Sequence, residues 1–170
     1  MKNTFSGKTV LITGHTGFKG SWLSIWLLKL GANVVGYSDK ILSPESLYAK
    51  ANLQDQLQTV FADINNFDTL DETIKKHNPE FVFHLAAQAI VSSGFDDPTT
   101  TFLTNAMGTE CLLRALRNNK SSKVRKVVII TSDKCYENIE QNYGYREHDQ
   151  LGGKDPYSAS KACAEIIISS

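Results

Sequence analysis

The chain has 170 residues, about the length of one domain and enough to bury a hydrophobic core. Hydrophobic residues make up 41% and charged residues 21%, as in ordinary globular proteins. Eighteen basic residues balance eighteen acidic ones, so no field of one sign predicts nucleic acid or an anionic membrane as a partner. No apolar run approaches the ~20 residues that cross a membrane, and the first apolar segment does not predict a signal peptide.

The number and spacing of the cysteines indicate whether the protein works in a reducing or an oxidising compartment. Cys111, Cys135 and Cys163 are odd in number, scattered, and without a C-x-x-C pair. This pattern argues against structural zinc and suits a reducing cytoplasm. The sequence contains no internal repeat and no low-complexity linker, so we expect one domain without a metal site.

The start of the chain predicts a strand, a glycine-rich turn and a helix. Residues 8–12 are apolar and β-branched, and residues 21–30 are apolar and followed by Gly31. Between them, Gly14, Gly17 and Gly20 follow the spacing G-x-x-G-x-x-G. The first glycine permits a tight turn, the second lets the backbone approach phosphates, and the third lets helix and strand pack closely.

Such a turn can bind the pyrophosphate of a dinucleotide, because the positive end of the helix and its free N–H groups face the ligand. An ordinary strand-to-helix turn is the alternative, since a glycine triplet alone is weak evidence. The order of strand, turn and helix favours the dinucleotide. We therefore expect cofactor contacts from Gly14, His15, Thr16, Gly17, Phe18, Lys19 and Gly20.

The remaining elements alternate between strands and helices. Further strands are expected at residues 33–37, 57–62, 81–85 and 126–131, and the last of these has the apolar composition of a buried strand. Helices are expected from a serine cap at residues 43–45, at 67–77 before Pro79, at 98–118, and from 156 to the end. Apolar strands between helices predict an α/β fold, a doubly wound parallel Rossmann sheet in the order 3-2-1-4-5.

Two acidic residues follow the second and third predicted strands. Asp39 lies about 20 residues past the glycines, where a carboxylate binds the adenosine ribose and repels a 2′-phosphate. No Arg lies nearby, which favours NAD over NADP, although Asp39 is equally well explained as a turn residue. Asp63 and Ile64 are placed to reach the adenine, or Asp63 caps the helix that follows.

Tyr157 and Lys161 form the pattern Tyr-x-x-x-Lys on the last predicted helix. Residues four apart share a helix face, so the ammonium group can lower the pKa of the phenol from its usual value near 10. The phenolate can then take a proton from a sugar hydroxyl while hydride leaves for nicotinamide, and the lysine can hold the nicotinamide ribose. A chance surface pair is the alternative, which the preceding glycine turn disfavours.

Thr131, Ser132, Asp133 and Lys134 end the fifth predicted strand. Ligands of open α/β sheets lie at the carboxyl ends of strands, so these side chains are expected to face a substrate. Either hydroxyl can bond the sugar hydroxyl that Tyr157 deprotonates, and Asp133 with Lys134 is a plausible acid/base pair. Without the Tyr-Lys pair, the segment would be read as a polar exit from the strand.

Together these motifs resemble the N-terminal half of the CDP-glucose 4,6-dehydratases, a family of extended short-chain dehydrogenases/reductases. The match covers nearly the whole chain, and its most specific part is the Ser-Asp-Lys triplet, because dTDP-glucose and GDP-mannose relatives usually carry glutamate at the lysine position. The chain departs from the family at residues 91–95, which lack the usual Arg and Tyr. The matching segments are residues 14–22, 84–88, 131–136 and 145–158.

The resemblance implies bound NAD and CDP-glucose as substrate: oxidation at C4, loss of water across C5 and C6, and hydride return to C6. Tyr157 would be the base at the 4-hydroxyl, Asp133 the acid at the departing 6-hydroxyl, and Lys134 would occupy the place of the base for C5. The resemblance extends the expected catalytic set to Ser132 and Lys161. It also extends the expected NAD contacts to Leu85, Ala86, Ala87, Gln88, Asn105, Thr131, Tyr157 and Lys161.

Family members continue for about as many residues again. The resemblance therefore implies that residues 1–170 are an incomplete NAD-binding domain that ends within the Tyr-Lys helix, before the later strands and the substrate domain. We expect the full-length protein to be a cytoplasmic lyase and a homodimer or higher homo-oligomer, used in O-antigen biosynthesis, and this chain alone to be inactive. The alternatives are another nucleotide-sugar epimerase or dehydratase of the same fold, or a non-catalytic NAD-binding module.

Overall fold

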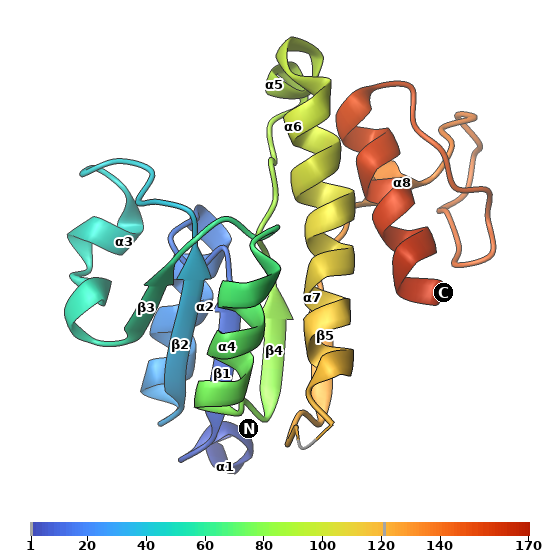
Figure 1. The fold of residues 1–170 in the computed structure, drawn as a ribbon. Coiled ribbons are helices and arrows are strands. Elements are labelled where there is room, and N and C mark those ends of the chain that lie inside the picture. The colour runs from blue at the N-terminus through green and yellow to red at the C-terminus, as the bar shows by residue number, and fades with distance from the viewer. Residues whose placement is uncertain (1, 121) are drawn as a thin grey trace. The chain divides into compact units, whose positions relative to one another are not determined.

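A computed structural model describes residues 2–120 and 122–170 of the chain (Figure 1). The chain forms two compact units. The first comprises Met1–Ala86 and Arg114–Ile130 and contains the sheet, and the second comprises Ala87–Leu113 and Thr131–Ser170.

Five parallel strands form the sheet of the first unit in the order β3-β2-β1-β4-β5. The register places Thr13 opposite both Tyr37 and His84, so the carboxyl ends of β1, β2 and β4 lie at one edge of the sheet. The doubly wound order expected from the sequence is confirmed. The strands are β1 (Thr9–Thr13), β2 (Asn33–Ser38), β3 (Gln58–Phe61), β4 (Phe81–His84) and β5 (Lys126–Ile129).

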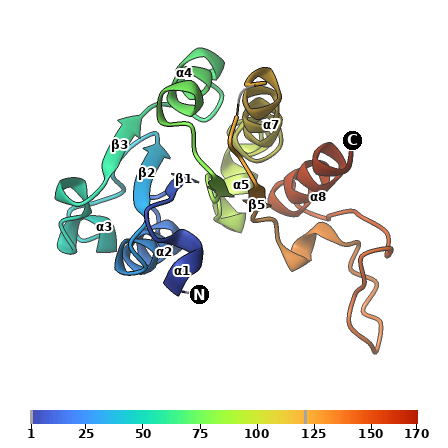
Figure 2. The same cartoon turned by 90° about the horizontal axis from the view of Figure 1, so that it is seen from below.

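Helices cover the sheet of this unit on both faces. Figures 1 and 2 show α2 (Phe18–Lys29) on one face and α4 (Phe67–His77) on the other. Leu27 of α2 packs against the strand residues in the main hydrophobic core, whereas Leu70 and Ile74 of α4 are fully buried. The shorter helices of the unit are α1 (Lys2–Phe5), α3 (Leu47–Lys50) and the 3₁₀ turn η1 (Leu53–Asp55).

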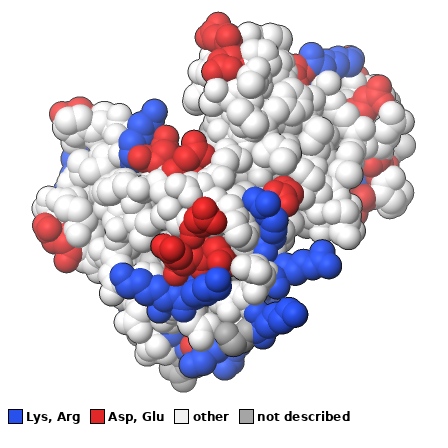
Figure 3. All heavy atoms as spheres, in the orientation of Figure 1, with Lys and Arg blue, Asp and Glu red and all other residues white. Residues whose placement is uncertain are grey.

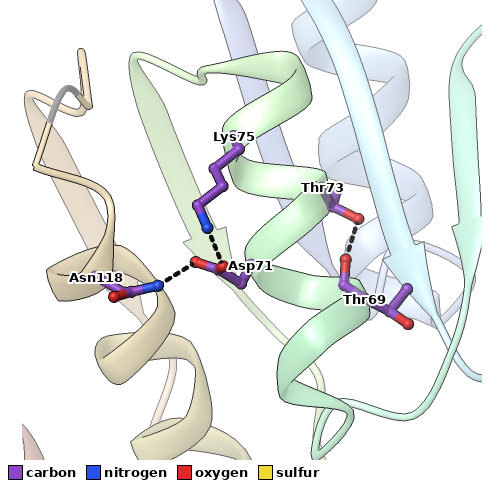
Figure 4. A network of polar contacts seen from close by, with 5 residues as sticks. All are labelled: Thr69, Asp71, Thr73, Lys75 and Asn118. Carbon is purple, nitrogen blue, oxygen red and sulfur yellow. Dashed lines mark hydrogen bonds and ion pairs between the residues drawn. The ribbon is translucent and has the colours of Figure 1, made fainter.

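Polar contacts join α4 to the end of α7 (Gly108–Asn118) within the first unit. The carboxylate of Asp71 accepts hydrogen bonds from Lys75 at 2.5 Å and from Asn118 at 3.1 Å (Figure 4). The guanidinium of Arg114 lies 4.2 Å from the ring centre of Phe67. Acidic and basic side chains lie intermixed on this visible face, so it presents no field of one sign (Figure 3).

The second unit consists of helices and loops. Residues 98–118 were expected to form one helix, but the chain runs as α6 (Pro98–Phe102), a π-helical segment η2 (Leu103–Met107) and then α7. α8 (Pro156–Ser169) begins and ends as predicted. Neither α5 (Val91–Asp96) nor the 3₁₀ turn η3 (Asp133–Cys135) was predicted from the sequence.

Three expectations about the elements were wrong in detail. α2 begins at Phe18, inside the glycine motif, rather than after it. The helix expected from residues 43–45 begins at Leu47 with Ser46 as its cap, because the backbone first makes a turn there. β5 is largely exposed rather than buried, because it forms the edge of the described sheet.

Candidate functional site

The glycine turn of the first unit is fixed by close backbone contacts. Gly14 has a φ of +72°, and a Cβ atom there would lie 2.6 Å from the backbone nitrogen of Ala86. A Cβ atom on Gly20 would lie 2.2 Å from the carbonyl oxygen of Gly14. At Gly17 a Cβ atom would meet only that carbonyl, at 3.3 Å. Gly14 and Gly20 are thus required by the fold, whereas Gly17 leaves room beside the turn.

The first turn of α2 carries no side-chain cap, and the N-cap residue is Gly17. The N–H donors of the first turn of α2 and the positive end of the helix dipole therefore remain available to an anion. Phe18 and Lys19 are both exposed at this end of the helix. The local geometry fits the pyrophosphate binding that the sequence predicted.

His15 differs from the other residues of the turn, because its side chain is buried in the first unit. Hydrogen bonds join its ring to Ser38 at 3.0 Å and to Thr59 at 3.2 Å. The ring occupies the space above Gly36, where a Cβ atom would lie 2.2 Å from it. Burial lowers the pKa of His15 to about 4, so the imidazole is neutral near pH 7. The ring therefore serves the packing of the turn.

The exit of β2 is tied to the same turn. The hydroxyl of Thr16 donates to the carbonyl oxygen of Lys40 at 2.7 Å. Asp39 is exposed, and its carboxylate lies 3.8 Å from the ammonium group of Lys40. Lys40 therefore places a cation next to the carboxylate that was expected, in the absence of a nearby arginine, to select NAD.

Asp63 follows β3 in a turn of its own. Its carboxylate accepts from the backbone and side-chain N–H groups of Asn65, and its carbonyl oxygen accepts from the hydroxyl of Tyr37 at 3.0 Å. The alternative that Asp63 caps the next helix was wrong, because Asn66 is the cap of α4. The side chain of the neighbouring Ile64 is buried.

The exit of β4 lies against the glycine turn. The hydroxyl oxygen of Thr13 accepts hydrogen bonds from the N–H groups of Leu85 and Ala86, each at 3.2 Å. The same oxygen is 2.6 Å from Nδ1 of His84. Thr13 thus fixes two of the residues expected to contact NAD, while the next two, Ala87 and Gln88, belong to the second unit.

In the second unit, Asn105 connects three segments. Its side-chain oxygen accepts from the backbone N–H of Gln88 at 2.9 Å, and its amide nitrogen donates to the Gln88 carbonyl oxygen at 3.0 Å and to the Ser160 hydroxyl at 2.9 Å. Ser160 donates in turn to the carbonyl oxygen of Tyr157. Asn105 is buried within the π-helical segment, so its amide holds the loop after β4 and α8 in place.

The Ser132-Asp133-Lys134 segment lies around η3. The hydroxyl of Ser132 donates to the Asp133 carboxylate at 3.1 Å and accepts from the N–H of Lys134 at 3.2 Å. Asp133 and Lys134 are exposed. Both line a cavity of about 330 Å³ in the second unit, which also receives the stacked rings of Tyr136 and Tyr145. An acid and an amine therefore share one solvent-accessible cavity.

α8 carries the Tyr-Lys pair. Asp155 caps the helix by accepting from the N–H and hydroxyl of Ser158. Burial opposes ionisation of Asp155, but these hydrogen bonds and the charge of Lys134 hold the pKa of its carboxyl below the usual value. Tyr157 is half-buried and Lys161 is buried, one turn apart on the helix.

Thr131 has a partner that the sequence analysis did not single out. Its hydroxyl donates a hydrogen bond to Oε1 of Glu165. The only sequence signal was spacing, because Glu165 continues the series Tyr157, Lys161 in steps of four along α8.

Residues 2–120 and 122–170 contain no group of three or more His, Cys, Asp or Glu side chains that could hold a metal ion. Among the same described residues, no helix combines the length and apolar character that a membrane crossing requires.

The chain matches the family model described as GDP-mannose 4,6 dehydratase over residues 11–170. A CDP-glucose 4,6-dehydratase of Salmonella typhimurium is 46% identical over 99% of this chain and 46% of its own length. A UDP-glucose 4-epimerase of Mycolicibacterium smegmatis is 35% identical over 93% of this chain and 49% of its own length. The solved structure of Thermus thermophilus UDP-glucose 4-epimerase in complex with NAD aligns with a TM-score of 0.81 at 28% identity, covering 95% of this chain and 50% of that one. The chain spans about half the length of these relatives.

Proposed function

The chain belongs to the family described as GDP-mannose 4,6 dehydratase, and on that premise we propose that it supplies the NAD-binding and catalytic residues of an enzyme that dehydrates CDP-glucose to CDP-4-keto-6-deoxyglucose. One observation carries the choice of reaction. The second unit contains both the Tyr157–Lys161 pair, on α8, and an acid and an amine, Asp133 and Lys134, which line one cavity. The 46% identity to a CDP-glucose 4,6-dehydratase supports the choice of substrate.

The glycine turn fits NAD. Gly14 and Gly20 close the turn through backbone contacts, and Gly17 leaves the uncapped start of α2 accessible to a pyrophosphate. Asp39, exposed at the exit of β2, would accept hydrogen bonds from the adenosine ribose. The chemistry that NAD supplies when bound is acceptance of a hydride from C4 of the glucose and its return to C6.

Tyr157 begins the reaction by removing the proton of the 4-hydroxyl. Lys161 shares a face of α8 with Tyr157, one helical turn away, so its ammonium group lies on the same side of the helix as the phenol. The same ammonium group is placed to hold the nicotinamide ribose. Ser132 can orient the sugar hydroxyl by accepting a hydrogen bond from it, because the proton of Ser132 is donated to Asp133. The hydroxyl of Thr131 donates to Glu165.

Asp133 and Lys134 then eliminate water. Lys134 accepts the proton of C5, which the 4-keto group has made acidic. Asp133 donates a proton to the departing 6-hydroxyl, which leaves as water. The exposure of both side chains to one cavity supports this division of roles.

Variants of the full-length protein test the scheme in single turnovers followed by NADH absorbance. Tyr157→Phe is expected to abolish NADH formation. Asp133→Asn is expected to form NADH normally and then to slow elimination by roughly 10²–10⁴-fold, so that NADH accumulates. Lys161→Met is expected to resemble Tyr157→Phe at neutral pH. If Asp133→Asn forms NADH as poorly as Tyr157→Phe, Asp133 acts in the oxidation instead.

A second candidate function is epimerisation of a UDP-sugar, which the 35% identity to a UDP-glucose 4-epimerase favours. Incubation with CDP-glucose, UDP-glucose and GDP-mannose, followed by mass spectrometry, separates the two. Loss of water from CDP-glucose supports dehydration, whereas an unchanged mass with an inverted C4 supports epimerisation. NAD binding without any turnover would indicate a non-catalytic binding module.

We also propose that the full-length protein works in the cytoplasm as a homodimer. The three cysteines, all within the described residues, form no disulfide bond, which suits a reducing compartment. Leu103, Met107, Ile166 and Ile168 of the second unit are exposed and apolar, which supports contact with another copy. Light scattering of wild type and Ile166→Arg tests this, because the charge is expected to shift a dimer toward monomer.

A further inference from the structure

Glu165 is the acidic residue of α8. It lies on the same helix as Tyr157 and Lys161 but has no role of its own in the proposed reaction. Tyr157, Lys161 and Glu165 follow one another in steps of four, so they occupy one face of the helix. Glu165 is half-buried, and its Oε1 atom accepts the hydrogen bond from the hydroxyl of Thr131. A carboxylate in this position faces protein, where an unpaired charge would be costly.

Thr131 lies between the end of β5 and the Ser132-Asp133-Lys134 segment. The last ladder bond of this strand runs from the N–H of Ile130 to the carbonyl oxygen of His84 at 3.0 Å. The next internal contacts belong to η3, where Ser132 caps the N–H of Lys134. Thr131 lies between these two bonded stretches, and its side chain is held by Glu165.

The negative charge of Glu165 also acts on Cys135 and Tyr136, at the other end of the same segment. Burial raises the pKa of the Cys135 thiol, and the negative charge of Glu165 raises it further. The pKa of Tyr136 is raised by burial first, with Glu165 among the smaller causes. The carboxylate therefore lies close to the start and to the end of residues 131–136.

We propose that Glu165 is a positioning residue, which acts through Thr131 to hold Asp133 and Lys134 in place relative to Tyr157 on the same helix. The inference rests on the proposed dehydration and adds to it a residue that touches neither sugar nor cofactor. A contact of this kind matters because a displacement of about 1 Å in a catalytic group can reduce turnover by about 10²-fold.

Kinetics of the full-length protein test the role of the hydrogen bond. Glu165→Leu and Thr131→Val are each expected to reduce kcat by about 10²-fold while KM for CDP-glucose changes less than about threefold. Glu165→Gln keeps a hydrogen-bond acceptor, so it is expected to retain kcat within about fivefold. Circular dichroism and melting temperature identify any variant that fails to fold.

A double variant separates action through Thr131 from an independent effect. Because the two residues form one contact, Thr131→Val combined with Glu165→Leu is expected to lose no more than the worse single variant. A loss equal to the product of the single losses would overturn the proposal. So would a Glu165→Gln variant as slow as Glu165→Leu, since the hydrogen bond would then not be the cause.

Thiol labelling of Cys135 tests the placement of Glu165 without any turnover. Glu165→Gln removes the negative charge, so labelling of Cys135 by an uncharged thiol reagent at pH 8, assigned by mass spectrometry, is expected to accelerate about threefold. Glu147→Gln is the matched control, an exposed carboxylate of the same unit that is expected to leave the rate unchanged. If wild type shows no dehydration but labelling responds, the proposed function fails and the placement stands. If turnover is present and labelling does not respond, the positioning role fails.

Discussion

The glycine turn of the first unit and the β5-exit segment of the second unit (residues 131–136) are held in different ways. In the turn, Gly14 and Gly20 bring backbone atoms so close that no side chain fits. In the β5-exit segment, single side chains such as Glu165 hold residues more than thirty positions away, for example Thr131. The region expected to bind the cofactor thus depends on local backbone shape, and the region expected to carry the chemistry depends on distant side-chain partners.

The largest expected loss of stability comes from adding a side chain within the glycine turn. Gly20→Ala places a Cβ atom 2.2 Å from the carbonyl oxygen of Gly14, which only a shift of the backbone can relieve. We expect the free energy of unfolding to fall by more than about 3 kcal/mol in urea titrations. Gly17→Ala is the matched control, because its Cβ atom meets a single atom at 3.3 Å, and we expect a loss below about 1 kcal/mol. Equal losses would show that the turn is not set by backbone proximity.

Asn105 is expected to show the next largest effect. Asn105→Leu leaves the N–H and carbonyl groups of Gln88, and the hydroxyl of Ser160, without their buried partner. We expect a loss of about 3 kcal/mol in the free energy of unfolding. Asn142→Leu makes the same chemical change at an exposed position of the same unit and is expected to be nearly neutral. A neutral Asn105→Leu would show that the loop after β4 and α8 are held by other contacts.

The same contrast explains what sequence reasoning could and could not find. The sheet order and the steric need for Gly14 and Gly20 follow from local patterns, namely apolar runs and glycine spacing, so they were predicted correctly. The roles of Glu165 and Ser160 were missed because their partners are distant in the chain. The exposure of β5 was missed for a related reason, since composition alone does not identify the edge of a sheet.

His15 is expected to make the stability of the turn depend on pH. Burial lowers its folded-state pKa to about 4, below the unfolded value of 6.5, so the unfolded chain binds more protons between these values. Stability is therefore fully present above about pH 6.5 and is lost as the pH falls toward 4, with a loss of roughly 2 kcal/mol by pH 5. Urea titrations from pH 4.5 to 7.5 measure the slope. His15→Gln is expected to reduce it, whereas His77→Gln, which changes a less buried histidine, is expected to retain most of it.

The smallest effects are expected at the polar contacts between α4 and α7, where the backbone of the first unit is already fixed by the sheet. Asp71 receives hydrogen bonds from Lys75 and Asn118, but the Lys75 side chain is 53% exposed, so solvent screens the ion pair. We expect Lys75→Ala to lower the free energy of unfolding by less than about 0.5 kcal/mol and Asn118→Ala by about 1 kcal/mol.

The side-chain hydrogen bond from Lys75 is the main cause that holds the pKa of Asp71 below its usual value. The stability that this carboxylate contributes is therefore present above the unfolded pKa and is lost as the pH falls through the folded one. Replacing Lys75 should reduce this loss on acidification even where the effect at pH 7 is small. If Lys75→Ala costs as much at pH 7 as Asn105→Leu, side-chain pairs stabilise the first unit as strongly as the second, and the contrast between the two regions does not hold.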